Sequence, residues 1–192
     1  MREIIKLIVV LFLFCAVSGG SLAVIKEATK DQIEYQELKA RVAPAVKAVL
    51  PPSENDPIAE RVKIQLGKKQ IITVFPAKKG GKLFALAYGV AGSGHGGPIQ
   101  VMVGIDIDGK ILGVKVVKHS ETPGIGTKAV NSQAFLNQFK GKSVTSKIAL
   151  SKAGGDIEAV SGATESSTGI TEGVAKAAEL FEKIKSKLET KG

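Results

Sequence analysis

The sequence predicts an α+β fold: an antiparallel β-meander packed with helices, preceded by one N-terminal transmembrane helix. Three observations predict it. Residues 7–25 form an uncharged apolar run, apolar and polar residues alternate between residues 61 and 116, and an apolar stripe at helical spacing follows residue 165. A chain of 192 residues with 44% hydrophobic content is long enough for one such domain and too apolar to be disordered.

The run at residues 7–25 has the length of a membrane-spanning helix, about 28 Å. Arg2 and Lys6 precede it, so the positive-inside rule predicts a cytoplasmic N-terminus and a domain on the extracytoplasmic side of the cytoplasmic membrane. A cleaved signal peptide is the alternative, because small residues cluster at positions 18–23. We favour the retained anchor because the apolar run exceeds the usual core of a signal peptide.

A helix and a connector are expected between the anchor and the domain. Thr29, with Gln32 three residues later, forms a capping box that predicts a helix start. Pro44 should kink or split this helix, and the proline pair at 51–52 should end it. The expected division of the chain is an anchor at 1–25, a helix and connector at 26–60, and the extracytoplasmic domain at 61–192.

Alternating hydrophobic residues predict the strands of the meander. They cover residues 62–66, 71–75, 83–90, 99–107 and 112–116. The glycine pair at 80–81 predicts a hairpin turn, and Asp108-Gly109 predicts a type I′ turn. The glycine-rich segment 92–98 is interpreted as a wide turn, with a loop whose amides approach a ligand as the alternative.

Two helices are expected after the meander. Residues 132–139 predict a short helix with Asn131 as its cap. The last helix should cover residues 165–188, because apolar residues there recur in steps of three and four and form one stripe that can pack on a sheet. An antiparallel sheet with packed helices is an α+β domain.

Composition excludes several kinds of site. A single cysteine rules out a disulfide framework and a thiolate metal cluster within the chain, and two histidines argue against a multi-histidine metal site. The net charge is +9, but the lysines are scattered and aromatic residues make up only 5%, so no nucleic-acid partner is expected. P-loop and serine-hydrolase motifs are absent from the sequence, and no catalytic residue is assigned.

Two segments contain more glycine and hydroxyl groups than connectors need. Residues 119–126 end the meander with Ser-Glu-Thr and then Pro-Gly-Ile-Gly, which presents side chains and amides from one corner. Residues 161–168 place five hydroxyl groups at the start of the last helix. Helix N-terminal amides and the helix dipole favour phosphate, so this segment predicts a phosphate-bearing ligand, with an elaborate N-cap as the alternative.

Together the two segments resemble the FMN-binding domain family, in particular the G subunits of Rnf electron-transport complexes (RnfG). The C subunits of sodium-translocating NADH:quinone oxidoreductase are relatives of that family. The resemblance rests on Ser161-Gly162-Ala163-Thr164 and on the sequence Glu-Thr-Pro-Gly-Ile-Gly at 121–126, behind an N-terminal anchor. It covers nearly the whole chain and implies an external domain that binds FMN.

The resemblance also implies a site. An ApbE-type flavin transferase would esterify FMN, through its phosphate, to Thr164. The implied neighbours of the phosphate are Ser161, Gly162, Ala163 and Ser166. The implied neighbours of the isoalloxazine ring are Glu121 and Thr122, with Pro123, Gly124 and the rest of that turn as a wall and His95 as a further candidate. The family usually has Asp three residues before the signature, where this chain has Glu158.

The implied function is a redox subunit that relays electrons through FMN. It would belong to a membrane-bound ferredoxin:NAD oxidoreductase complex coupled to sodium or proton translocation, with the other Rnf subunits, of the A, B, C, D and E types, as partners. We expect no independent catalytic activity. The alternatives are a stand-alone flavoprotein for extracellular electron transfer, which a second signature or a large extra domain would favour, and a non-redox cationic envelope-binding module.

Overall fold

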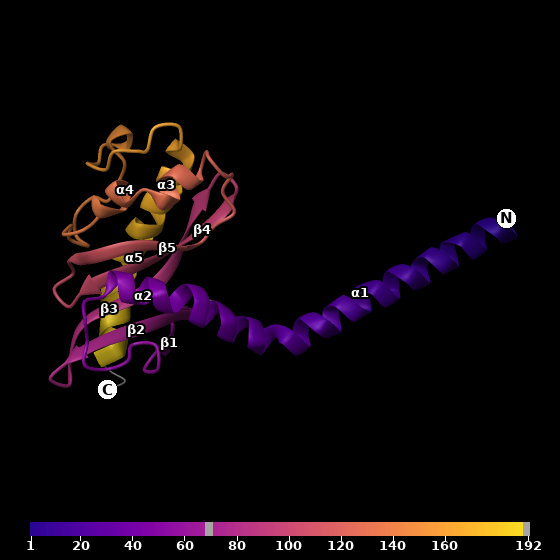
Figure 1. Cartoon of the computed structure of the whole chain (residues 1–192), viewed down its shortest axis with the longest axis horizontal. Coiled ribbons are helices and arrows are strands. Elements are labelled where there is room, and N and C mark those ends of the chain that lie inside the picture. The colour runs from indigo at the N-terminus through magenta and orange to yellow at the C-terminus, as the bar shows by residue number, and fades with distance from the viewer. Residues whose placement is uncertain (68–70, 190–192) are drawn as a thin grey trace. The chain divides into compact units, whose positions relative to one another are not determined.

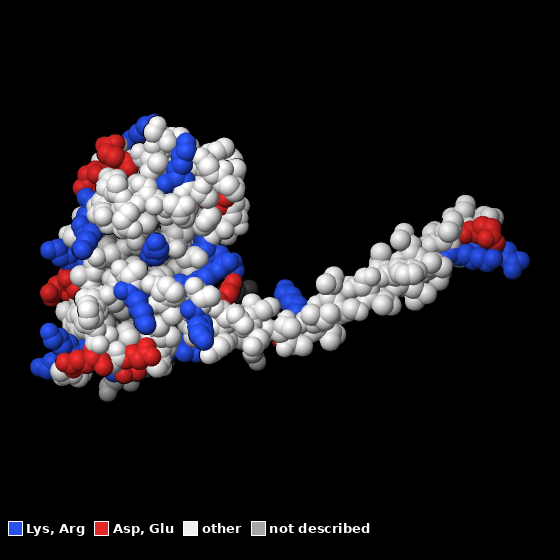
Figure 2. Space-filling view, viewed as in Figure 1, with Lys and Arg blue, Asp and Glu red and all other residues white. Residues whose placement is uncertain are grey.

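The computed structural model describes residues 1–67 and 71–189 and divides into two compact units, Met1–Ala40 and Arg41–Gly192. The first unit is almost entirely one helix, α1 (Arg2–Glu37). Its stretch Arg2–Lys30 contains an 18-residue window with a mean hydropathy of 2.6 and is long and apolar enough to cross a membrane. In Figure 2 the face of this stretch in view carries charged side chains near its ends and none along its middle.

The predicted helix start at Thr29 is wrong, because α1 continues through this residue. The Thr29 hydroxyl donates to the carbonyl oxygen of Ile25 at 2.7 Å, which is the bond that Thr makes inside a helix. A π-helical turn, Leu38–Val42, follows α1, and α2 (Ala43–Val49) begins with Pro44 in its first turn. The expected split at Pro44 is confirmed, since a proline there removes no helical hydrogen bond.

The second unit is built on one antiparallel sheet with the strand order β1-β2-β3-β4-β5. Strands that follow each other in the sequence pair with each other throughout, so the predicted meander is confirmed (Figure 1). The strands are β1 (Val62–Gln65), β2 (Ile71–Lys79), β3 (Lys82–Gly94), β4 (Gly97–Asp106) and β5 (Ile111–Lys118).

Helices cover both faces of the sheet (Figure 1). The long helix α5 (Thr164–Glu189) packs on β3 and β4, as the apolar stripe predicted, and α2 packs on the opposite face, mainly over β4 and β5. Between β5 and α5 the chain forms α3 (Thr127–Asn131), α4 (Gln133–Asn137) and a 3-10 turn, Ser151–Ala153. The fold is therefore α+β, as predicted.

The cap predicted for the short helix is wrong by one residue. Asn131 ends α3, and Ser132 is the N-cap of α4, whose hydroxyl oxygen accepts from the N–H of Phe135 at 3.2 Å. Both residue types cap helices well, so the sequence alone did not separate them.

The turn predicted at Asp108-Gly109 is tighter than the one observed. Type I′ requires a positive φ at both central residues, but only Gly109 has one, at 83°. The carboxylate of Asp106 accepts from the N–H of Asp108 at 3.0 Å, and the N–H of Gly109 donates to the carbonyl oxygen of Asp106 at 3.1 Å. These bonds stabilise a longer loop in place of the two-residue turn. The expected turn at Gly80-Gly81 is present, with φ values of 58° and 73°.

The glycine-rich segment 92–98 belongs to the sheet, which corrects the expectation of a wide turn. β3 and β4 extend through it and leave only His95 and Gly96 between them. A Cβ on Gly92 would lie 1.8 Å from the carbonyl oxygen of Gly169 in α5. The glycine is therefore required because strand and helix backbones approach each other closely here.

The larger core lies between the sheet and α5. Tyr88 is fully buried there and its hydroxyl donates to the carbonyl oxygen of Ala177 at 2.6 Å. On the opposite face, Gly104 and Gly113 pair across β4 and β5 and lie beneath α2. A Cβ on Gly104 would lie 2.2 Å from the carbonyl oxygen of Val49, so this glycine lets α2 rest directly on the sheet.

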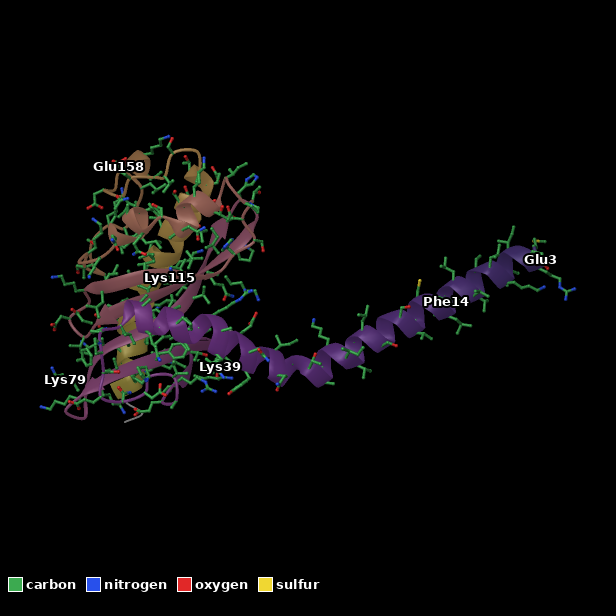
Figure 3. The ribbon with its side chains drawn as sticks, in the orientation of Figure 1. Glu3, Phe14, Lys39, Lys79, Lys115 and Glu158 are labelled. Atoms are coloured by element: carbon green, nitrogen blue, oxygen red, sulfur yellow. The ribbon has the colours of Figure 1, made fainter. Side chains whose placement is uncertain are left out.

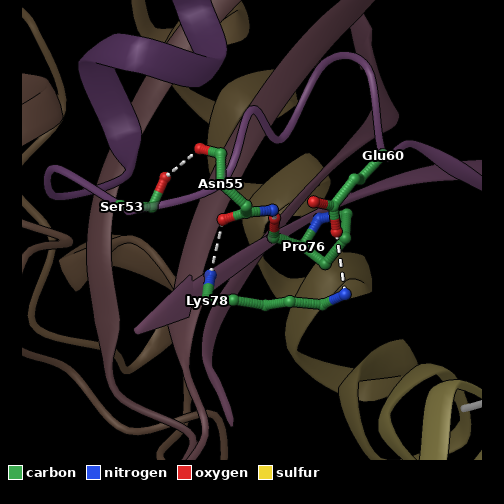
Figure 4. A network of polar contacts seen from close by, with 5 residues as sticks. All are labelled: Ser53, Asn55, Glu60, Pro76 and Lys78. Carbon is green, nitrogen blue, oxygen red and sulfur yellow. Dashed lines mark hydrogen bonds and ion pairs between the residues drawn. The ribbon is translucent and has the colours of Figure 1, made fainter. Parts of the chain in front are cut away.

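The connector at 53–60 is fastened to the part of β2 that extends beyond β1 (Figure 4). The Asn55 amide donates to the carbonyl oxygen of Pro76 at 2.9 Å and accepts from the N–H of Lys78 at 2.8 Å. The Lys78 ammonium group also pairs with Glu60 at 2.8 Å and lowers the pKa of that carboxyl group. The Asn55 side chain thus takes the place of a neighbouring strand along this edge, together with the N–H of Glu54, which donates to the carbonyl oxygen of Lys78 at 3.0 Å.

Candidate functional site

A pocket with a volume of about 290 Å³ opens at the start of α5. It brings together three segments that are far apart in the sequence: the β3–β4 turn, the corner at 121–126 and the first turn of α5. The lining residues are His95, Glu121, Thr122, Ile125, Gly126, Gly162, Ala163, Thr164, Glu165 and Ser166. The two motifs singled out in the sequence therefore share one cavity.

Gly162 shapes the turn that leads into α5. Its φ is +74°, a conformation that other residues rarely adopt, and the N–H of Ala163 closes the turn on the carbonyl oxygen of Val160 at 2.9 Å. The Ser167 hydroxyl accepts from the N–H of Val160 at 3.1 Å and donates to the carbonyl oxygen of Ala163 at 2.9 Å. These bonds fix Thr164 as the first residue of the helix.

The first turn of α5 offers unused donors. In the part of the chain that the structure describes, the backbone N–H groups of Thr164, Glu165 and Ser166 have no protein acceptor. Thr164 is half-buried, and its hydroxyl group likewise has no partner among the described residues. Free N–H groups and the positive end of the helix dipole make this turn suited to an anion.

Glu121 is a buried carboxylate, 5% exposed, that joins the three segments around the pocket. Its Oε1 accepts from the N–H of Gly96 at 2.8 Å, and its Oε2 accepts a close hydrogen bond from the Ser166 hydroxyl. Its own N–H donates to Nδ1 of His119 at 3.2 Å. Because the hydroxyl hydrogen of Ser166 is directed to Glu121, the donor that Ser166 offers to the pocket is its backbone N–H.

Residues 122–125 of the corner are exposed, whereas Gly126 is buried. Thr122, Pro123 and Gly124 lie at the surface, and Gly124 has a φ of +76° while its N–H donates to the Thr127 hydroxyl at 2.8 Å. Ile125 is 59% exposed and places an apolar side chain on the rim of the pocket. This corner thus presents a partly apolar wall on the side opposite the start of α5.

Three further residues singled out in the sequence do not form the walls of the pocket. His95 is exposed on the rim of the pocket, and Ser161 is exposed in the turn before α5. Glu158 lies on a surface loop with an exposed side chain (Figure 3). Its main chain is held by Gln138, which accepts from its N–H at 2.8 Å and donates to its carbonyl oxygen at 3.0 Å.

Two further residues lie near the pocket and were not predicted as site residues from the sequence. Glu165 lines it, and Nζ of Lys128 lies 4.0 Å from the place where a Cβ on Gly162 would be. An acidic residue at a helix start is common, and only the fold brings a lysine of α3 to the turn before α5. Among the described residues, no group of three or more His, Cys, Asp or Glu side chains is arranged to hold a metal ion.

Comparison with known proteins agrees with the motifs. Residues 94–179 match the FMN-binding domain family. The chain is 34% identical to the G subunit of the ion-translocating oxidoreductase complex of Stutzerimonas stutzeri, over 88% of this chain and 76% of the relative. It is 28% identical to the G subunit of the Na⁺-translocating ferredoxin:NAD⁺ oxidoreductase complex of Acetobacterium woodii, over 95% and 94%. A solved structure, NqrC of Shewanella oneidensis, aligns with a TM-score of 0.49 at 25% identity, over 80% of this chain and 74% of that one.

Proposed function

We propose that this chain, which belongs to the family of G subunits of ion-translocating oxidoreductase complexes, relays electrons through FMN held covalently on Thr164. One observation carries the proposal: the two motifs meet in one pocket at a helix N-terminus that has unused donors. The match to the FMN-binding domain family includes both motifs. FMN supplies the electron-transfer chemistry when it is bound, and the chain supplies its position and surroundings.

The start of α5 fits the phosphate of such a group. The Thr164 hydroxyl is the attachment point, the backbone N–H groups of Glu165 and Ser166 donate to the phosphate oxygens, and Gly162 and Ala163 leave room for them. Ester formation in water needs an activated phosphoryl donor. An ApbE-type transferase would therefore join Thr164 Oγ1 to the phosphorus of a flavin dinucleotide, break its pyrophosphate bond and release a nucleoside monophosphate with the hydroxyl proton.

The wall of the pocket formed by the corner at 121–126 is suited to the isoalloxazine ring of FMN. Thr122 and the apolar Ile125 line the pocket on one side, with Pro123 and Gly124 between them in the sequence but not among its lining residues, and His95 lies at its rim. The pocket is open at the surface, so one edge of a ring held here would stay accessible to a partner. Electron relay needs no acid or base from the chain, and we assign no catalytic residue.

The complex lies in the cytoplasmic membrane. We assign α1 to a single membrane span with Arg2 and Lys6 on the cytoplasmic side, which places the flavin domain outside. The partners are the other subunits of an Rnf-type complex, of the A to E types. That complex would move electrons between ferredoxin and NAD and couple them to sodium or proton translocation, as the name of the Acetobacterium relative states for sodium.

Intact-mass measurement tests whether FMN is attached to Thr164. The full chain is produced together with an ApbE-type transferase as the unchanged protein and as T164A and T168A. Thr168 is the matched control because it lies one turn further along α5 and its hydroxyl donates to the Thr164 carbonyl oxygen at 3.0 Å. Intact mass and in-gel flavin fluorescence should show an FMN adduct on the unchanged chain and on T168A, and none on T164A. An adduct on T164A would contradict the proposal.

A further inference from the structure

Glu121 differs from every other carboxylate of the described residues, because it is the only Asp or Glu that is buried. Burial of a carboxylate is costly unless hydrogen bonds compensate for the lost water. Both of its oxygens accept, one from Gly96 and one from Ser166. This pattern suits the ionised form, which has acceptors only.

The backbone closes around this carboxylate. A Cβ on Gly94 would lie 2.5 Å from Oε1 of Glu121, and a Cβ on Gly126 would lie 2.3 Å from Oε2 and 2.6 Å from Oγ of Ser166. A Cβ on Gly96 would lie 2.1 Å from the carbonyl oxygen of Ser120. Three glycines from two segments therefore allow the contact, and a bulkier residue at any of them would disturb the packing around the carboxylate.

We propose that Glu121 is a positioning residue with two effects: it holds the β3–β4 turn and the first turn of α5 together around the flavin, and its negative charge lowers the reduction potential of that flavin. The charge acts at the wall of the pocket, where little water screens it. A fixed negative charge opposes the arrival of electrons on the ring, so the reduced form is less favoured.

This inference rests on the proposed function and is tested on the full flavin-bearing chain in detergent. E121Q keeps the shape and the acceptor for Gly96 but removes the charge, and its amide can donate to Ser166. E179Q is the matched control, because it removes one negative charge from an exposed site about four turns along α5 from Thr164. Spectroelectrochemical titration should give a more positive potential for E121Q than for the unchanged chain, and no shift for E179Q.

A second measurement uses chain made without transferase, so that no flavin is attached. Hydrogen exchange of residues 92–98 should be faster in E121A than in the unchanged chain and unaltered in E121Q, which still holds Gly96. Equal potentials for E121Q and the unchanged chain would overturn the electrostatic effect, and unaltered exchange in E121A would overturn the positioning effect. An unchanged chain that carries no flavin in the presence of the transferase would instead overturn the proposed function on which this inference rests.

Discussion

Four polar residues are buried in the part of the chain that the structure describes, and they gather at the corner and the start of α5: Glu121, Ser166, Ser167 and Thr171. The Thr171 hydroxyl donates to the Ser167 carbonyl oxygen at 2.8 Å, and Ser167 bonds within the turn before the helix. Satisfied buried polar groups hold a unique geometry. The site is thus stiff at the residue that would carry the flavin.

Single residues differ in how far the sequence predicts them. Thr164 stands out because its motif is local and precedes a clear helix. The structural role of Glu121 could not be predicted, because its partners Gly96 and Ser166 lie 25 and 45 residues away in the sequence. Motif similarity predicted Glu121 as a site residue, whereas only the fold shows what its carboxylate contacts.

Tyr88→Phe tests a single buried hydrogen bond. Removing the hydroxyl that donates to Ala177 should lower the free energy of unfolding at neutral pH by about 1 kcal/mol. Burial also raises the pKa of Tyr88 far above its ordinary value of 10.0, so the unfolded chain loses this proton before the folded chain does. The stability that the protonated Tyr88 hydroxyl contributes is full below pH 10 and falls as the pH rises above 10. Urea unfolding of Y88F and of the unchanged chain, at pH 7 and above pH 10, measures both effects. If the rise in pH destabilised Y88F as much as the unchanged chain, the loss of stability could not be assigned to Tyr88.

Elements with a strong period were predicted well, whereas some of their ends and turns were not. The strands and α5 follow from apolar periodicity, which tertiary contacts reinforce. The errors at Thr29 and Asn131 arose because Ser, Thr and Asn cap helices about equally well and Thr also fits inside them. The segment 92–98 was misassigned because glycines that permit a close strand–helix contact look like turn glycines in the sequence.

Gly92→Ala tests whether the contact between β3 and α5 positions the site. A methyl group there would meet the Gly169 carbonyl oxygen, so β3 and α5 must separate, at a cost of about 1–3 kcal/mol. Gly89→Ala on the same strand is the control, since its nearest neighbours would lie at 3.9 Å. G92A should unfold at a lower temperature and carry less attached flavin than the unchanged chain, whereas G89A should match the unchanged chain in both. Equal behaviour of the two variants would show that the close approach is unimportant.

At the scale of the whole molecule, the chain combines an apolar helix with a domain that has its own core. The proposed covalent bond would retain FMN on a domain proposed to lie outside the cell, where a dissociated cofactor would be lost. In Figure 2 the lysine and arginine side chains in view are spread over the domain and mixed with acidic ones, so this face presents no single basic stripe for a polyanion.

The proposed orientation predicts which side of the membrane each unit occupies. In a C15S background, a cysteine replacing Lys140, which is exposed on the domain, should react with a membrane-impermeant maleimide in intact spheroplasts. A cysteine replacing Glu3 should react only after the membrane is opened. The reverse pattern would place the domain in the cytoplasm.

The most direct test of the electron relay is ferredoxin-dependent NAD⁺ reduction in anaerobic membranes whose complex contains this chain as its G-type component. With T164A, the activity should fall to that of membranes lacking the chain, while immunoblots show the other subunits at their usual levels, and T168A should retain it. Full activity with T164A in an assembled complex would mean that electrons do not pass through a flavin at this threonine.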